Sequence, residues 1–159
     1  MNTNHLTRLR WAFPAVALVL LLSAATSLRA AELTWQTDFA VASKQAAQEH
    51  KYILLDFTGS DWCPWCIKMD KEVFDQSQFS DFAVKNLVLV KVDFPRKAAQ
   101  SPAEKNQNEE LAKKYAIEGF PTYILLDSNG KEVRRQVGYL QGGVTAFIGW
   151  LALSGQTQG

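Results

Sequence analysis

The sequence predicts a single α/β domain in which short buried strands alternate with amphipathic helices. Three apolar runs, each bounded by turn-forming or polar residues, are typical of buried strands and lie at residues 52–57, 87–94 and 122–127. Segments with apolar side chains at helical spacing separate and follow these runs. With 159 residues, 47% of them hydrophobic, and no internal repeat, the chain has the size of one domain with its own core.

In the first half of this domain, helices and strands follow one another closely. Residues 38–50 predict an amphipathic helix with Asp38 as its candidate N-cap, and the strand at 52–57 comes directly after it. Apolar residues at helical spacing then predict helices over 66–74 and 77–86, before the strand at 87–94.

The second half begins with a break in this pattern. Residues 95–108 contain two prolines in a polar, Ala-rich stretch, which predicts a surface loop, or a loop with one helical turn. A short helix is expected at 109–117, followed by the strand at 122–127 and a turn centred on an Asn-Gly pair. Residues 131–139 alternate valines with charged residues as an edge strand does, and 142–154 predict a terminal helix.

The first thirty residues predict a secretory signal peptide, so that the domain proper covers 31–159. Arg8 and Arg10 form a basic start without acidic residues, eighteen uncharged residues follow, and small residues surround Ala30. The alternative is an uncleaved anchor, because eighteen such residues reach the lower limit for spanning a bilayer. Under both interpretations the domain is exported and is periplasmic or secreted, in the second case tethered to the membrane.

Net charge limits the class of partner. The whole chain has 17 Lys and Arg against 16 Asp and Glu, and the predicted leader takes three arginines and no acidic residue, which leaves 14 against 16. No basic run survives in the exported domain, so nucleic acid is not expected as a partner. We expect the partner to be a protein or a small thiol.

The two cysteines of the chain, Cys63 and Cys66, stand two residues apart in "DWCPWC". Exported domains that rely on disulfide staples carry more cysteines, and a bridge across so short a loop constrains the unfolded chain little. A zinc site needs further ligands, and the exported domain has only His50 as a histidine. We therefore expect no metal and no cofactor, and interpret the pair as a redox couple.

The position of the pair explains how it could work. It lies between the strand at 52–57 and the helix at 66–74, and Pro64 suits the first turn of a helix. Unpaired N–H groups and the helix dipole favour an anion there, so we expect a lowered pKa and an exposed, nucleophilic thiolate at Cys63. Cys66, one turn further on, should be more buried and stay protonated.

The stretch "LLDFTGSDWCPWCIKM" resembles the active-site segment of the thioredoxin superfamily, and the likeness continues through nearly the whole exported chain. This resemblance implies the thioredoxin fold, an α/β fold with a mixed sheet of four or five strands flanked by helices on both faces. It also implies a cis-proline at Pro121 in "GFPT", with the backbone of Phe120 pairing with an incoming peptide. "VGYL" resembles the glycine loop beside the active site and would bring Gly138 to the substrate groove.

The resemblance gives Asp56 the part of the buried acid under the pair, which takes the proton from Cys66. An Asp that faces solvent at the end of the strand is the alternative. This sequence has one residue more between Asp56 and Cys63 than typical thioredoxins, and we expect it to bulge in the loop. Lys91 would either lie near Asp56, as the strand lysine of the family does, or be exposed.

The implied chemistry is thiol–disulfide exchange. Cys63 attacks a disulfide of the substrate, and Cys66 then resolves the mixed disulfide. The expected substrate-binding residues are Trp62, Pro64, Trp65, Phe120, Pro121 and Gly138. Of these, the three aromatic residues and Pro121 should form a flat apolar rim.

The direction of exchange is predicted to be reductive. Strongly oxidising relatives commonly have a histidine between the cysteines, whereas Pro64 and Trp65 carry no charge. The chain has no room for the helical insertion of periplasmic oxidases or the dimerisation domain of isomerases, and we expect a monomer. We expect a reductase or electron relay supplied by a membrane or thiol electron donor. The alternatives are an oxidase or isomerase of the same fold, a metal chaperone, and a redox-silent binding module.

Overall fold

The computed structural model describes residues 33–151. The predicted signal peptide and the last three residues of the predicted terminal helix lie outside the described residues. Between 33 and 151, no helix combines the length and the apolar composition needed to cross a bilayer.

The described chain forms one mixed sheet. Its strands are β1 (Trp35–Gln36), β2 (Tyr52–Thr58), β3 (Leu87–Asp93), β4 (Thr122–Leu126) and β5 (Glu132–Val137). They lie in the order β1-β3-β2-β4-β5. β3 runs parallel to both β1 and β2, whereas β4 is antiparallel to both β2 and β5.

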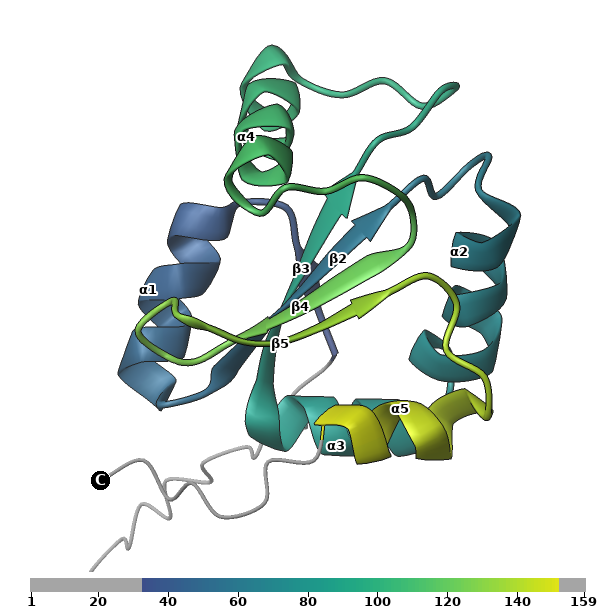
Figure 1. Ribbon diagram of the computed structural model, residues 1–159. Helices are drawn as coiled ribbons and strands as arrows, with labels where there is room; N and C mark the ends of the chain where they lie inside the picture. Colours follow the sequence, from purple (N-terminus) through teal and green to yellow (C-terminus); the bar gives the residue numbers. More distant parts are fainter. Residues whose placement is uncertain (1–32, 152–159) are drawn as a thin grey trace, which may run out of the picture. The chain divides into compact units, whose positions relative to one another are not determined.

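Helices cover both faces of this sheet (Figure 1). They are α1 (Phe39–Glu49), α2 (Pro64–Met69), the π-helix η1 (Asp70–Phe74), α3 (Ser77–Asn86), α4 (Pro102–Lys114) and α5 (Gly143–Leu151). α1 and α4 lie on one face, and α2, α3 and α5 lie on the other. The predicted α/β class and thioredoxin fold are therefore confirmed, with five strands in the sheet.

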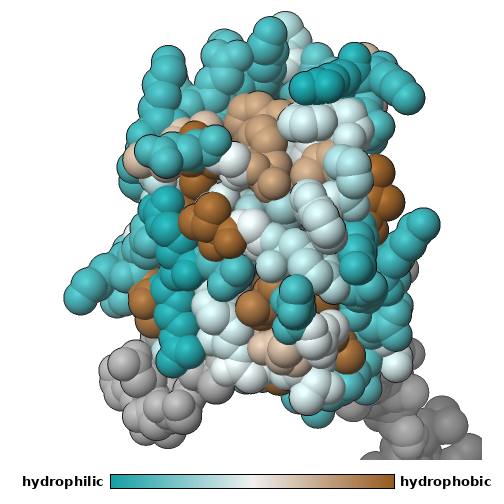
Figure 2. All heavy atoms as spheres, turned by 45° about the vertical axis from the view of Figure 1, so that its right-hand side comes forward, coloured by the Kyte–Doolittle hydropathy of each residue, from teal (hydrophilic) through white to brown (hydrophobic). Residues whose placement is uncertain are grey.

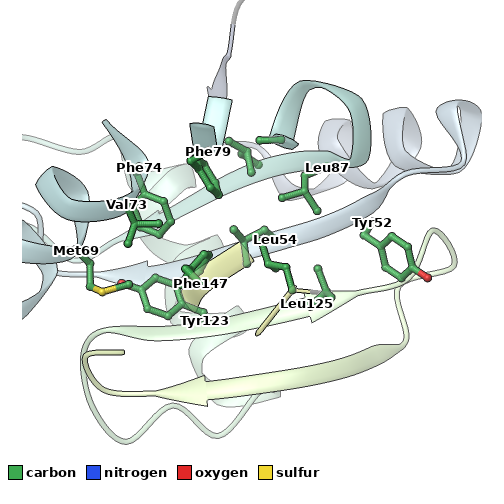
Figure 3. Close-up of a cluster of buried hydrophobic side chains, with 13 residues drawn as sticks. Tyr52, Leu54, Met69, Val73, Phe74, Phe79, Leu87, Tyr123, Leu125 and Phe147 are labelled. Atoms are coloured by element: carbon green, nitrogen blue, oxygen red, sulfur yellow. The ribbon is translucent and has the colours of Figure 1, made fainter. Parts of the chain in front are cut away.

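Strand β2 divides the core in two, because successive side chains of a strand point to opposite faces. Tyr52 and Leu54 pack with α2, η1, α3 and α5 in the cluster drawn in Figure 3. Ile53, Leu55 and Phe57 pack on the other face with α1 and α4. The same alternation points Asp56 toward the face that carries α2.

The segment at 95–108 differs from its prediction as a loop. α4 begins at Pro102, so seven residues expected in the loop are helical. Ser101 is the N-cap, its side chain accepts a hydrogen bond from the Glu104 N–H at 3.1 Å, and Pro102 occupies the first turn, where its missing N–H costs nothing. The sequence did not predict this part of the helix, because its first two turns are largely exposed and show no apolar residues at helical spacing. Only Asn108 of these residues is buried, and its side-chain amide donates to the Asp93 carbonyl at 2.9 Å.

Two further elements were absent from the sequence prediction. β1 has two residues, too few for a period of two to be visible, and Trp35 holds it against the core by packing edge-on to Phe74 at 5.2 Å. The helix expected over 66–74 consists of α2 followed by η1, where the chain adopts π-helical hydrogen bonding. Asp38 caps α1 as expected, because its carboxylate accepts from the Val41 N–H at 3.0 Å.

Candidate active site

Cys63 and Cys66 are joined by a disulfide at the start of α2, with their Cα atoms 5.3 Å apart. Cys63 is the N-cap residue, and its sulfur accepts from the Cys66 N–H at 3.2 Å. In this oxidised state Cys63 is 4% exposed and Cys66 is 2% exposed. The expected contrast between an exposed and a buried cysteine is therefore wrong for the disulfide form. The asymmetry of the pair lies in position, because Cys63 precedes the helix and Cys66 lies in its first turn.

The loop before the pair takes up the additional residue. β2 stays in regular register with β3 as far as Thr58, so Asp56 remains inside the strand. The chain then turns, and the Cys63 N–H donates to the Gly59 carbonyl at 2.8 Å. Ser60 fixes this turn to the end of β3 through two hydrogen bonds to the Asp93 carboxylate, from its N–H at 2.9 Å and from its hydroxyl at 2.5 Å.

Asp61 joins the active-site loop to the segment after β3. Its carboxylate accepts three backbone hydrogen bonds, from the N–H groups of Arg96, Lys97 and Ala98 at 2.9, 2.7 and 3.1 Å. These donors, with the Arg96 N–H as the largest contributor, hold the pKa of Asp61 below its usual range. Residues 95–101, which we call the 95–101 loop, are thereby fastened beside the cysteine pair.

Trp62 is held in place from several sides. Its indole N–H donates to the Phe94 carbonyl at 2.8 Å, and the Arg96 guanidinium carbon lies 3.8 Å from its ring centroid. Phe120 packs edge-on against the same ring at 5.9 Å. A pocket of about 390 Å³ opens beside it, lined by Trp62, Cys63, Ile117, Glu118, Gly119 and Phe120. Three residues predicted from the sequence to act together thus line one pocket.

Trp65 stands on the outer side of the pair and is 54% exposed. Its ring packs on Tyr139 at 5.3 Å, and the Lys68 ammonium lies 4.6 Å from the Tyr139 ring centroid. The Tyr139 hydroxyl donates to the Glu72 carboxylate at 2.5 Å, and this hydrogen bond raises the pKa of Tyr139. The family resemblance placed the segment of Tyr139 beside the active site but assigned no role to Tyr139 or Lys68.

The surface on this side of the molecule is mixed in character. Figure 2 turns the α2 side of Figure 1 forward and shows near-neutral and hydrophobic side chains along the middle of this face, with hydrophilic ones toward its edges. Exposed Pro64 and Trp65 are the residues of α2 that continue the rim beyond the cysteines.

The segment around Pro121 lies next to β5. The Phe120–Pro121 peptide bond is cis, and Pro121 is buried. The Gly138 N–H donates to the Pro121 carbonyl at 2.8 Å, which ties the glycine loop to the proline segment. Gly138 has a φ of +78°, a backbone conformation that favours glycine. The structure therefore brings these two predicted substrate-binding residues together.

Asp56 is 1% exposed, so the solvent-facing alternative is wrong. Neither of its carboxylate oxygens has a hydrogen-bond partner among the residues that the structure describes. Burial raises the pKa of Asp56 to about 8, with further increases from the charges of Asp70 and Asp93 and an opposing effect of Lys91. In the sheet, Asp56 is paired with Lys91 on one side and with Tyr123 on the other.

Two further polar groups adjoin Asp56, and sequence reasoning missed both. Asp70 follows Cys66 by four residues, a spacing that puts both on one helical face and could have identified it. Burial raises the pKa of Asp70, and Lys91 approaches its carboxylate at 4.0 Å. The pKa of Tyr123 is raised by burial and by the nearby charges of Asp56 and Asp70. In the range 33–151, no group of three or more His, Cys, Asp or Glu side chains is placed to hold a metal ion.

A family model for a thioredoxin-like domain matches residues 39–151. The chain belongs to the thioredoxin-like family. This thioredoxin-like chain is 41% identical over 121 residues to the disulfide bond reductase DsbH of Chlamydia pneumoniae, a match that covers 76% of the chain and 72% of that protein. A solved structure of a DsbH oxidoreductase superposes with a TM-score of 0.71 at 39% identity, covering 82% of this chain and 89% of the other.

Other relatives are longer than the matched region. The thioredoxin-like chain is 29% identical over 114 residues to the thioredoxin-related protein DsbJ of Chlamydia pneumoniae and spans only 33% of it. It is 32% identical over 111 residues to the thiol:disulfide interchange protein DsbD of Actinobacillus pleuropneumoniae and spans 17% of that protein. Together with the bonded cysteine pair, the relationship to DsbH shows that the chain is a thiol–disulfide oxidoreductase.

The close packing of the Trp62 ring against Gly59 in the thioredoxin-like chain gives a first testable prediction. A Cβ at Gly59 would lie 2.5 Å from the Trp62 ring, which cannot withdraw without losing its contacts to Phe94 and Arg96. We expect Gly59→Ala to lower the free energy of unfolding by about 1–3 kcal/mol, as overpacking does, and to slow disulfide reduction. Chemical denaturation and a disulfide-reduction assay measure the two effects.

Gly149→Ala is the matched control, because a Cβ at Gly149 in α5 would meet nothing within 4 Å. It should leave the rate unchanged and stabilise the helix by up to about 1 kcal/mol. Equal stability of the Gly59→Ala and native proteins would contradict the account of Trp62 as a rigid wall.

Proposed function

We propose that this thioredoxin-like chain reduces the disulfides of exported proteins, or relays electrons to them. The observation that carries the proposal is the pair of Cys63 at a helix start and Cys66 one turn on, on the face of the sheet toward which Asp56 points. The relative with 41% identity is named a disulfide bond reductase, which supports the reductive direction.

The proposed reaction has two steps. In the dithiol form, the Cys63 thiolate attacks one sulfur of a partner disulfide, forming a mixed disulfide and releasing the other partner sulfur as a thiolate that takes up a proton. Cys66 then loses its proton and attacks the Cys63 sulfur. The Cys63–Cys66 disulfide forms, the second partner thiol leaves, and two electrons have passed to the partner.

Asp56 is proposed to receive the proton of Cys66 in the second step. A carboxyl with a pKa of about 8 can gain and release a proton near neutral pH, whereas an ordinary Asp is too acidic to hold one. Lys91 lies in the adjacent strand, where its charge limits how far burial raises the pKa. This is a proposed role, supported by burial and by the register of β2.

The residues between the cysteines support a reducing pair. Neither Pro64 nor Trp65 has a charge that would stabilise a Cys63 thiolate and thereby favour the dithiol form. We expect a reduction potential nearer the value of about −270 mV for thioredoxin than the value of about −120 mV for a strong oxidant. Equilibration with glutathione buffers measures it, and a value at the oxidising end would favour the oxidase alternative.

The proposed setting is an oxidising, exported compartment, periplasmic or secreted, which the signal-peptide prediction supports. A dithiol does not persist there unaided, so a membrane or thiol donor must return two electrons after each turnover. We propose that the domain acts as a monomer, which sedimentation can test, and that protein thiols and disulfides are its partners.

The decisive experiment replaces the resolving cysteine. In Cys66→Ser the first step proceeds and the second cannot, so mixed disulfides with Cys63 should accumulate in the native host. Purification and mass spectrometry then identify the trapped proteins. The double variant with Cys63→Ser is the control and should trap none.

The outcomes separate the remaining functions. Trapped proteins that already held a disulfide before the exchange support a reductase, whereas a set of newly made proteins awaiting oxidation would indicate an oxidase. Recovery of no mixed disulfide, together with tight stoichiometric binding of zinc or copper by the dithiol form, would indicate a metal chaperone. A redox-silent binding module would retain its partners in the double variant.

A further inference from the structure

The 95–101 loop does more than connect β3 to α4, because it brings two basic residues to the edge of the active site. Arg96 and Lys97 are exposed, and Arg96 contacts the ring of Trp62, the residue directly before Cys63. The backbone of this loop is bound to Asp61, two residues before Cys63. Its position raises the question of what Arg96 recognises.

The loop is a rigid support for Arg96. Three successive N–H groups of residues 96–98 bind the Asp61 carboxylate, and the Gln100 side chain donates to the Asp93 carbonyl at 3.0 Å. At its start, the Phe94 N–H donates to the Thr58 carbonyl at 2.9 Å. Because the backbone is fixed on both sides, little loop entropy is lost when a ligand binds Arg96.

The guanidinium of Arg96 contacts the Trp62 ring, and its N–H groups form no hydrogen bond or ion pair within residues 33–151. Its carbon lies 3.8 Å from the Trp62 ring centroid, a stacking contact that uses the planar face of the group. No side-chain hydrogen bond or ion pair of Arg96 is formed within residues 33–151, since Asp61 engages only its backbone N–H. A stacked guanidinium keeps its N–H donors in a fork that matches a carboxylate.

The surrounding charges favour an acid at this place. The positive charge of Lys97 acts on the Asp61 carboxylate, which three backbone N–H groups also engage, so these two charges offset one another. The Arg96 guanidinium forms no ion pair within residues 33–151 and keeps its charge for an acid. Glu118, which lines the pocket with Trp62 and Cys63, has the opposite charge and disfavours an acid in the pocket itself. We therefore expect an acidic side chain of a partner to bind Arg96 beside Trp62 and to be repelled near Glu118.

We propose that Arg96 is a specificity-determining residue, which binds a carboxylate of the partner polypeptide close to the cysteine that Cys63 attacks. The inference rests on the proposed function, since it concerns the polypeptide that takes part in the exchange. Trp62 lines the pocket beside Cys63 and contacts Arg96 through its ring, so the Arg96 fork lies one side chain away from the pocket in which a partner sulfur would meet Cys63. Partners with an acidic residue near the disulfide are thus selected.

The test uses two synthetic peptides that differ at one position. Each has one cysteine joined to 2-thiopyridine in a mixed disulfide, and one residue next to that cysteine is either Glu or Gln. Attack by Cys63 on the peptide sulfur releases thiopyridone, and Cys66 then displaces the peptide thiol. Stopped-flow absorbance gives the second-order rate constant of the reduced protein with each peptide.

We expect the native protein to react with the Glu peptide roughly fivefold faster than with the Gln peptide, as a well-oriented, partly exposed ion pair allows. The ratio should fall toward one in Arg96→Ala and at high salt. Arg96→Lys should recover only part of it, because an ammonium lacks the planar fork. Lys105→Ala, which removes an exposed charge on α4, should leave the ratio unchanged.

Each contrary result has a distinct meaning. Equal rates of the native protein with both peptides would overturn the inference while leaving the proposed function standing. Slowing of both peptides by the same factor in Arg96→Ala would also overturn it, since Arg96 would then only position Trp62. Failure of the reduced native protein to release thiopyridone from either peptide would refute the proposed function itself.

Discussion

Cys63→Ser is expected to abolish disulfide exchange, lowering the rate by roughly a thousandfold or more. A serine hydroxyl stays protonated at neutral pH and is a poor nucleophile toward sulfur, whereas a thiolate at the start of α2 benefits from the N–H groups of the first turn. A disulfide-reduction assay with a protein substrate measures the loss. Circular dichroism should show the fold intact, because the short loop closed by the disulfide contributes little to stability.

Cys66→Ser is the matched control for that substitution. It removes the same number of sulfur atoms from the same turn but leaves Cys63 in place at the N-cap. We expect it to react once with a disulfide, at a rate near that of the native dithiol, and to stop at the mixed disulfide. If Cys66→Ser failed in the first step while Cys63→Ser retained it, the assigned order of attack would be reversed.

Asp56→Asn is expected to stabilise the protein strongly at alkaline pH. The pKa of Asp56 is about 8 in the folded protein against 3.8 as the ordinary value. Between these values the folded state holds a proton that the unfolded state releases. Stability therefore falls as the pH rises through this window, by about 1.4 kcal/mol per pH unit, and stays level below and above it.

An Asn at this position does not titrate, so it removes the whole slope. The gain in the free energy of unfolding should be larger at pH 8.5 than at pH 5 by on the order of 4 kcal/mol, as linkage requires. Urea denaturation of the disulfide form at both pH values measures it. Asp81→Asn, at an exposed carboxyl of α3, is the control and should produce no comparable difference. A pH-independent effect of Asp56→Asn would mean that Asp56 is ionised throughout.

The same substitution should slow the second step of exchange. Asn cannot accept the proton of Cys66, and loss of a general base costs roughly a hundredfold or more in rate. Resolution of a preformed mixed disulfide should rise in rate through the pKa of Asp56 in the native protein and lose that rise in the variant. A stabilised protein that is also slower would separate this role from simple damage to the fold.

Strong local signals in the sequence predicted most of the fold. The apolar run of β2, the turn residues after it and the helical spacing beyond Cys66 depend only on neighbouring residues, and all three were predicted. The start of α4 was missed because an exposed helix has no apolar period, and its first-turn Pro102 was taken as part of a loop. β1 was missed because two residues cannot show a period.

The candidate active site, like the fold, was predictable from the sequence only in part. The sequence by itself determined the redox pair, since two cysteines at a strand-to-helix turn, in a chain whose first residues predict export, leave few other interpretations. The family resemblance predicted several neighbours of the pair, among them Pro121 and Gly138, and the tertiary structure decided which polar and charged groups contact one another there. Strand pairing joins Asp56 to Tyr123 and Lys91, and loop contacts bring Arg96 onto Trp62. These residues are distant in the sequence, and burial and charge act through space, so no local pattern could reveal them.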